Sequence, residues 1–243
     1  MTDSETTTVV PPLRLGGLLR TTLRTYRDHA ARVAWTAVAL YVPIGFLEAF
    51  VVDVGEGYSD RHDGFLAALL FAFVLIVTSV SVAGDAFFAG FLDAAVGEEV
   101  HGHPRRSIPQ ILRTLPYRRL IIADFILSFG IATGSVAFVV PGLVLFTLFC
   151  LIGPLINIER LTVRQAFARS FRLVRPVFWI TAVAVTLPVV AEHELAHALQ
   201  VWAVGSYLLK ALVDGVLAAV VYSLVGMVEV TLAYELIRRD QPG

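Results

Sequence analysis

Long runs of apolar residues restrict the fold of this chain more than any other feature of its sequence. A helix needs about 20 mainly apolar residues to cross the hydrocarbon core of a membrane. Hydrophobic residues make up 57% of the 243 residues and charged residues only 16%, so a soluble core could not hold all the apolar surface. Lipid is therefore the expected solvent. The runs lie at approximately 33–54, 64–96, 120–140, 142–158, 177–191 and 206–237.

These six runs are expected to be helices. A backbone in lipid must satisfy its own hydrogen bonds, and the runs lack the alternation over ~10 residues that marks barrel strands. Pro141-Gly142 indicates a tight turn between the third and fourth runs. The sequence predicts an all-α polytopic membrane protein with six transmembrane helices in three hairpins. Residues 13–240 form a single membrane domain, and residues 1–12 form a disordered cytoplasmic tail without the pattern of a signal peptide.

The positions of the arginines predict the orientation of the chain. All of the 19 Lys and Arg residues except Arg61 and Lys210 lie in four clusters, at 14–32, 105–119, 160–175 and 238–239. With six spans, all four clusters fall on the same side of the membrane. The excess of positive charge marks that side as cytoplasmic. We therefore expect a multi-pass protein of a prokaryotic cytoplasmic membrane, with both termini in the cytoplasm.

Each hairpin is preceded by a short basic segment with the pattern of an amphipathic helix. The second and third segments open with the capping-box patterns Ser107-x-x-Gln110 and Thr162-x-x-Gln165. Such helices lie in the membrane interface, where their cations attract anionic headgroups. The alternative interpretation is that they only anchor the topology. The candidate lipid-contacting residues are Arg20, Arg24, Arg27, Arg164, Arg172 and Arg175.

The stretch PGLVLFTLFCLIGPLINIERLTVRQAFARSFRLVRPVFW, residues 141–179, is the most distinctive part of the chain. It resembles the membrane domain of bacterial membrane-anchored glycerophosphodiester phosphodiesterases. The matching elements are Pro141-Gly142, Pro154, Glu159, Ala166-Phe167, Arg169-Ser170, Leu173 and Phe178-Trp179. The resemblance implies a six-span membrane domain standing alone. It implies no activity, because the phosphodiesterase chemistry of those proteins lies in a catalytic barrel that this sequence lacks.

The sequence His193-Glu194-Leu195-Ala196-His197 has the H-E-x-x-H pattern of zinc peptidases. Histidines at i and i+4 share a helix face and can bind zinc, while the Glu activates a metal-bound water. The third ligand is not local; His62 and Asp214 are the candidates. The alternative is a helix at the outer interface over residues 192–203, whose polar face meets water and headgroups. We expect no cofactor, and zinc remains the alternative.

Acids inside apolar runs are the other candidate functional residues, because ionisable groups are costly within a membrane. Asp85 and Glu229 lie within the second and sixth runs. A proton- or ion-coupled transporter could use such a pair, but packing residues would look the same in the sequence.

The interpretation that these features favour is a non-catalytic integral membrane module, which contacts lipids or a membrane protein partner. A homo-oligomer is also compatible with the sequence, and no nucleic-acid partner is expected. The alternatives are an outward-facing zinc-dependent hydrolase or peptidase that uses residues 193–197, and a small proton- or ion-coupled transporter.

Overall fold

The computed structural model describes residues 13–58, 84, 86–97, 107–137, 139–202 and 207–240. Within these ranges every regular element is helical and no strand occurs, which confirms the all-α prediction. The longer helices are α1 (Leu15–Tyr58), α5 (Tyr117–Ala137), α10 (Leu187–Trp202) and α11 (Tyr207–Asp240). The shorter helices are α4 (Ile108–Thr114), α6 (Val139–Phe149), α7 (Ile152–Ile158), α8 (Val163–Val174) and α9 (Phe178–Thr181).

Three helical stretches in the described part of the chain are long and apolar enough to cross a membrane. They are Val140–Ile158, Val163–Leu199 and Leu208–Asp240. The helical segment Ala86–Val96 is apolar but shorter, and most of the predicted second span lies outside the described residues. These helices agree with a membrane protein, while the number of six spans and their pairing in hairpins stay predictions.

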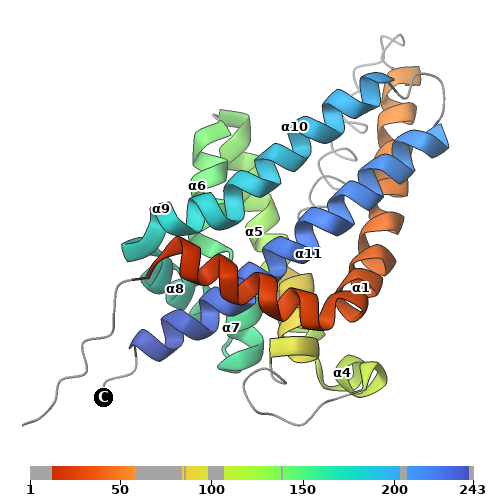
Figure 1. Cartoon of the computed structure of the whole chain (residues 1–243). Coiled ribbons are helices and arrows are strands. Elements are labelled where there is room, and N and C mark those ends of the chain that lie inside the picture. Colours follow the sequence, from red (N-terminus) through yellow and green to blue (C-terminus); the bar gives the residue numbers. More distant parts are fainter. Residues whose placement is uncertain are drawn as a thin grey trace, which may run out of the picture.

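Helix α1 joins two elements that the sequence predicted as separate. The basic segment and the first span form one helix without a break. Figure 1 shows that this helix turns sharply, so that its N-terminal part crosses α11. The Thr36 hydroxyl donates to the Arg32 carbonyl at 2.8 Å, a bond from side chain to backbone that often accompanies helix bending. The basic segment is therefore held by the helix that it crosses as well as by its own amphipathic pattern.

The turn predicted at Pro141-Gly142 is displaced. Both residues lie in the first turn of α6, where a proline is tolerated because the first N–H groups of a helix have no partner within it. A Cβ atom on Gly134 of α5 would lie 3.2 Å from the backbone N of Gly142. The dipeptide thus contributes a close contact between α5 and α6, and the chain reverses before it.

The predicted fifth span is longer than the sequence suggested. The chain remains helical from Phe178 to Trp202, with a π-helical stretch at Ala182–Thr186 between α9 and α10. Pro188 lacks an N–H and its ring would collide with a carbonyl one turn earlier in a regular α-helix. The wider π-helical turn before it provides a physical reason for the uninterrupted helix. Residues 192–202 therefore continue the helix of the span and do not form a separate interfacial helix.

Both predicted capping boxes are confirmed. The backbone N–H of Ser107 donates to Gln110 Oε1 at 3.0 Å, and the N–H of Thr162 donates to Gln165 Oε1 at the same distance. These bonds satisfy backbone donors that a helix leaves free at its start. They fix where α4 and α8 begin, and so where the arginines of both helices lie.

Several helices pack so closely that their backbones touch at glycine. A Cβ atom on Gly153 of α7 would lie 2.0 Å from the carbonyl oxygen of Ala86. A Cβ atom on Gly45 of α1 would lie 2.7 Å from the backbone N of Gly215 in α11. Small residues at such contacts are typical of helix packing in membranes, where close approach replaces the hydrophobic driving force between helices.

Buried polar side chains join the same helices. Asp124 of α5 accepts hydrogen bonds from the backbone N–H groups of Ala86 and Phe87, at 3.1 and 2.9 Å. The Asn157 amide donates to the buried carboxylate of Asp93 at 2.5 Å. Polar groups buried without partners are costly, so these pairs restrict how the helical segment Ala86–Val96 can sit between its neighbours.

We expect the substitution Gly153→Ala to lower the midpoint of thermal unfolding in detergent, because the added methyl group must displace the backbone at Ala86. Overpacking of this kind costs about 1–3 kcal/mol. The matched control is Gly130→Ala on α5, where nothing lies within 4 Å of the added Cβ atom. Alanine forms helices better than glycine, so the control should be neutral or stabilising. Equal destabilisation by both substitutions would contradict the packing argument.

Candidate functional site

Residues 193–197, which we call the HELAH sequence, lie near the end of α10. His193, Glu194 and His197 are exposed, while Glu192 and Ala196 face the protein and are 8% exposed each. Leu195 and Leu199 are also exposed, at 48% and 39%. The two histidines and the two leucines thus all point away from the helix bundle, as residues at a boundary between lipid and water would.

The described residues do not assemble a zinc site around this sequence. They contain no group of three or more His, Cys, Asp or Glu side chains that could hold a metal ion. The candidate third ligand Asp214 is buried on α11, and it is not grouped with the two exposed histidines. The other candidate, His62, lies outside the described residues. The helix does place His193 and His197 one turn apart, but this spacing supplies only two ligands.

Of the two acids singled out for transport, Asp85 lies outside the described residues. Glu229 of α11 is 2% exposed. It lies beside the stacked rings of Tyr41 and Tyr222, whose centroids are 4.9 Å apart, in a recess too narrow for a water molecule. An ion could enter there only by displacing packed side chains. This arrangement favours a packing role for Glu229.

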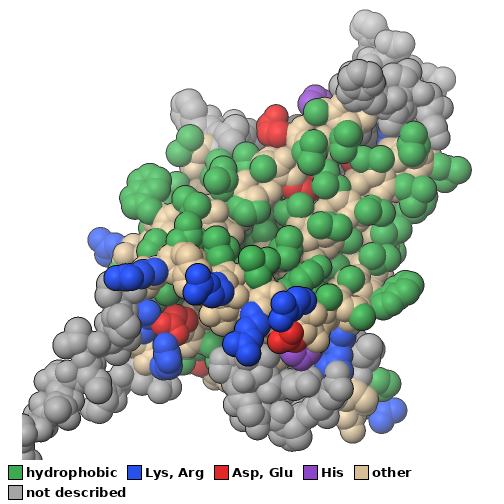
Figure 2. All heavy atoms as spheres, viewed as in Figure 1, with side chains coloured by type: hydrophobic (Ala, Val, Ile, Leu, Met, Phe, Trp, Pro, Cys, Tyr) green, Lys and Arg blue, Asp and Glu red, His purple; other side chains and the backbone are tan. Residues whose placement is uncertain are grey.

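The candidate lipid-contacting arginines are brought to one end of the molecule. All six of them are exposed. Figure 2 shows Lys and Arg side chains along one edge of the visible face, with hydrophobic side chains covering α10 and α11 beyond that edge. A basic edge next to an apolar surface is the arrangement expected of a membrane protein whose cations lie at headgroup level.

Other arginines at this end bind the protein itself. The Arg32 guanidinium donates to the Ala95 carbonyl at 2.9 Å. Arg119 donates to the carbonyls of Arg160 and Leu161 at 2.9 and 3.3 Å. Arg160 has a φ of 54°, a left-handed conformation that is uncommon for a residue with a side chain. Arg119 thus supports the irregular link between α7 and α8.

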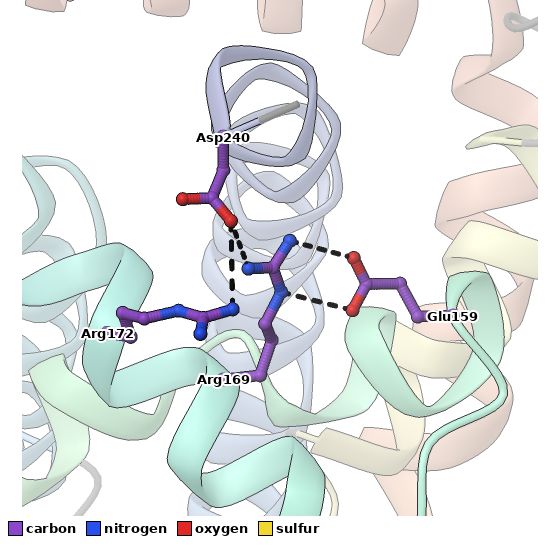
Figure 3. A network of polar contacts seen from close by, with 4 residues as sticks. All are labelled: Glu159, Arg169, Arg172 and Asp240. Atoms are coloured by element: carbon purple, nitrogen blue, oxygen red, sulfur yellow. Dashed lines mark hydrogen bonds and ion pairs between the residues drawn. The ribbon is translucent and has the colours of Figure 1, made fainter. Parts of the chain in front are cut away.

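Arg169 is the centre of a network that joins three elements, shown in Figure 3. Its Nε and Nη2 donate to the two carboxylate oxygens of Glu159, each at 3.1 Å. Its Nη1 donates to Asp240, the last residue of α11. Arg172 lies 3.7 Å from the same carboxylate oxygen. We call these four residues the Arg169 network; it connects α8 to the residue that follows α7 and to the end of α11.

The Arg169 network places a negative charge where the helix itself disfavours one. A carboxylate at the C-terminus of a helix meets the negative end of the helix dipole. The 34 residues of α11 extend about 50 Å, beyond the roughly 30 Å of a hydrocarbon core, so Asp240 can lie outside the membrane. The hydrogen bond from Arg169 lowers the pKa of the Asp240 carboxyl. The two arginines therefore offset the unfavourable position of this charge.

No pattern in the sequence pairs the residues of the Arg169 network. Glu159 and Arg169 are among the residues that resemble the phosphodiesterase membrane domain, and that resemblance assigns no role to either of them. Arg169 and Asp240 are separated by 71 positions, so no helical spacing or local motif connects them. The charge pattern could identify the basic end, but only the fold separates arginines bound to the protein from those left exposed.

Comparisons with protein-family models, with curated proteins and with solved structures found no match to this chain. The resemblance to the membrane domain of glycerophosphodiester phosphodiesterases therefore stays a prediction, carried by the residues of 141–179.

We expect the purified protein to contain no stoichiometric zinc, and His197→Ala to leave its metal content unchanged. The reason is that two exposed histidines without a convergent third ligand bind zinc weakly. Elemental analysis of the wild type and the variant, after dialysis against a mild chelator, measures this. One zinc per chain in the wild type, lost in the variant, would establish the metal site instead.

Proposed function

We propose that the protein is a non-catalytic integral membrane module whose basic end contacts the headgroups of anionic lipids. One observation carries the proposal. Of the six candidate arginines, Arg20, Arg24, Arg164 and Arg175 are exposed and have no ion pair or hydrogen bond to another side chain within the described ranges. Among the described residues, Arg27 forms an ion pair only with the exposed Asp28, at 3.8 Å. These guanidinium groups are therefore available to a partner outside the chain.

The surroundings of these arginines favour the phosphate of a lipid headgroup as their partner. Exposed apolar side chains continue directly from the basic residues, including Trp179 at 79% and Phe171 at 41% exposure. Tryptophan in particular gathers at the boundary between lipid and water. Each Lys or Arg near an anionic leaflet contributes about 1 kcal/mol of attraction. A surface with several such arginines is suited to hold anionic lipids without catalysing a reaction.

The proposal includes the orientation expected from the sequence. Six spans would place the basic end in the cytoplasm of a prokaryotic cell, with both termini on that side. The resemblance of residues 141–179 to the phosphodiesterase membrane domain supports a module of this type, and a membrane protein partner or a second copy could occupy its apolar surface. The zinc hydrolase and the transporter remain weaker alternatives, since neither has a formed site among the described residues.

The topology makes a direct prediction. Single cysteines at Ser59 and Ser107, introduced in a Cys150→Ser background, should differ in their reaction with an impermeant thiol reagent on intact cells. Position 59 should be labelled and position 107 should be protected, because the arginine cluster at 105–119 is expected on the cytoplasmic side. Cys150 is the chain's single cysteine, so the background is free of other thiols. The opposite labelling pattern would reverse the proposed orientation.

The lipid role is tested by replacing Arg164, Arg172 and Arg175 together with Gln. We expect native mass spectrometry to show weaker retention of phosphatidylglycerol and unchanged retention of phosphatidylcholine, because only the anionic headgroup loses its counter-charges. The matched control replaces the same three residues with Lys, which keeps the charge. Equal phosphatidylglycerol retention in the wild type and the Gln variant would contradict a lipid role for this surface.

A further inference from the structure

Exposed side chains extend from the basic end of α8 through α9 to the start of α10. Arg172, Arg175, Trp179, Val183 and Leu187 follow one another at intervals of three or four residues along the end of α8, the 3₁₀ turn Arg175–Val177, α9, the π-helical stretch and the start of α10, and all five are exposed. The Arg172 side chain is 67% exposed. Trp179, Val183 and Leu187 are 79%, 45% and 57% exposed. We call these five residues the α8–α10 face.

The α8–α10 face has the length and polarity of one lipid molecule. Twelve residues separate Arg175 from Leu187, which corresponds to about 18 Å of helix. One leaflet contributes about half of a hydrocarbon core that is roughly 30 Å thick. A phospholipid with its phosphate at the arginines would therefore lay its acyl chains along Trp179, Val183 and Leu187.

The charged end of this face is suited to phosphate. Guanidinium groups bind phosphate oxygens through charge-assisted and often paired hydrogen bonds. The Arg175 guanidinium lies over the Phe171 ring, 5.9 Å from its centroid, and it has no carboxylate partner within the described part of the chain. The contact with the ring holds the charge at the surface, where a headgroup can reach it.

Arg172 differs from Arg175 because it already has an anionic neighbour. Its nearest acid is Asp240, 3.7 Å away, and the Asp240 side chain is 41% exposed. Arg169 also holds Asp240, and Arg169 is itself fixed by its paired bonds to Glu159. Arg172 therefore already has a carboxylate oxygen beside it, of the kind that a phosphate would replace. An exposed ion pair of this kind contributes little stability, so exchange for another oxyanion is easy.

On the basis of the proposed lipid role, we propose that the α8–α10 face binds one anionic phospholipid of the inner leaflet, and that Asp240 competes with its phosphate for Arg172. The phosphate lies between Arg172 and Arg175, and the acyl chains cover Trp179, Val183 and Leu187. Lipid binding releases Asp240 from Arg172, while Arg169 keeps its bonds to Glu159.

The first test is Asp240→Asn, measured by native mass spectrometry with phosphatidylglycerol and phosphatidylcholine. Removing the competing charge should raise phosphatidylglycerol retention about five-fold, the equivalent of the ~1 kcal/mol assigned to one arginine near an anionic surface. Adding Arg172→Gln should abolish this gain. If the gain persists without Arg172, it reflects net charge alone and the competition is overturned.

The matched control is Glu235→Gln, which removes a negative charge from the same end of α11. Glu235 pairs with Arg238 and Arg239, each at 2.6 Å, and not with Arg172. Any gain in this variant should survive the addition of Arg172→Gln. A gain that vanishes with Arg172 in both backgrounds would overturn the specific role of Asp240.

A separate pair of variants tests the apolar part of the proposed lipid site. Leu187→Gln should reduce phosphatidylglycerol retention, whereas Leu208→Gln on α11, 62% exposed, should not. Equal effects would indicate a general lipid annulus and overturn the site. If the wild type retains phosphatidylglycerol and phosphatidylcholine equally, the proposed function itself fails. If the wild type prefers phosphatidylglycerol but Asp240→Asn changes nothing, only the competition fails.

Discussion

The structure depends on the requirement that polar groups in lipid find their partners within the protein. Helices satisfy the backbone by themselves, but the chain also buries carboxylates and amides between them. Asp124 accepts from the backbone N–H groups of Ala86 and Phe87, and Asp93 accepts from Asn157. These bonds require the helices to come close, and Gly153 allows it by leaving room for the Ala86 carbonyl. Buried polar bonds and glycine contacts thus specify the same arrangement.

The features that the sequence could predict are those encoded by neighbouring residues. Apolar runs predict helices because their length and composition match a membrane, and Thr162 with Gln165 predicts the start of α8 because the two residues bond each other. Pro141 was misleading, since a proline fits the first turn of a helix as well as a tight turn. The predicted end of the fifth span at residue 191 was too early: a π-helical stretch accommodates Pro188 and the helix continues, and no local pattern indicates that adjustment.

The candidate site was predicted in part. Clustered arginines identify a basic end, because the charge bias of loops is a property of the sequence alone. Their division into structural and exposed groups depends on partners far along the chain: Arg119 reaches the carbonyl of Arg160, and Arg169 reaches Asp240. The HELAH sequence is a local pattern that predicted a site which the described residues do not form. Its spacing is correct for two zinc ligands, yet a site needs a third group supplied by the fold, and the described residues do not supply one.

The Arg169 network gives the basic end a property that a simple cluster of charges lacks. Arg169 is 14% exposed and holds Glu159 through paired hydrogen bonds from Nε and Nη2, along one edge of its guanidinium group. Arg172, one turn later on α8, is 67% exposed and shares Asp240 with it. One arginine is therefore held within the protein and the other is exposed, although both face the same carboxylate. Because Asp240 ends α11, this shared carboxylate joins α8 to the helix that α1 and α10 both contact.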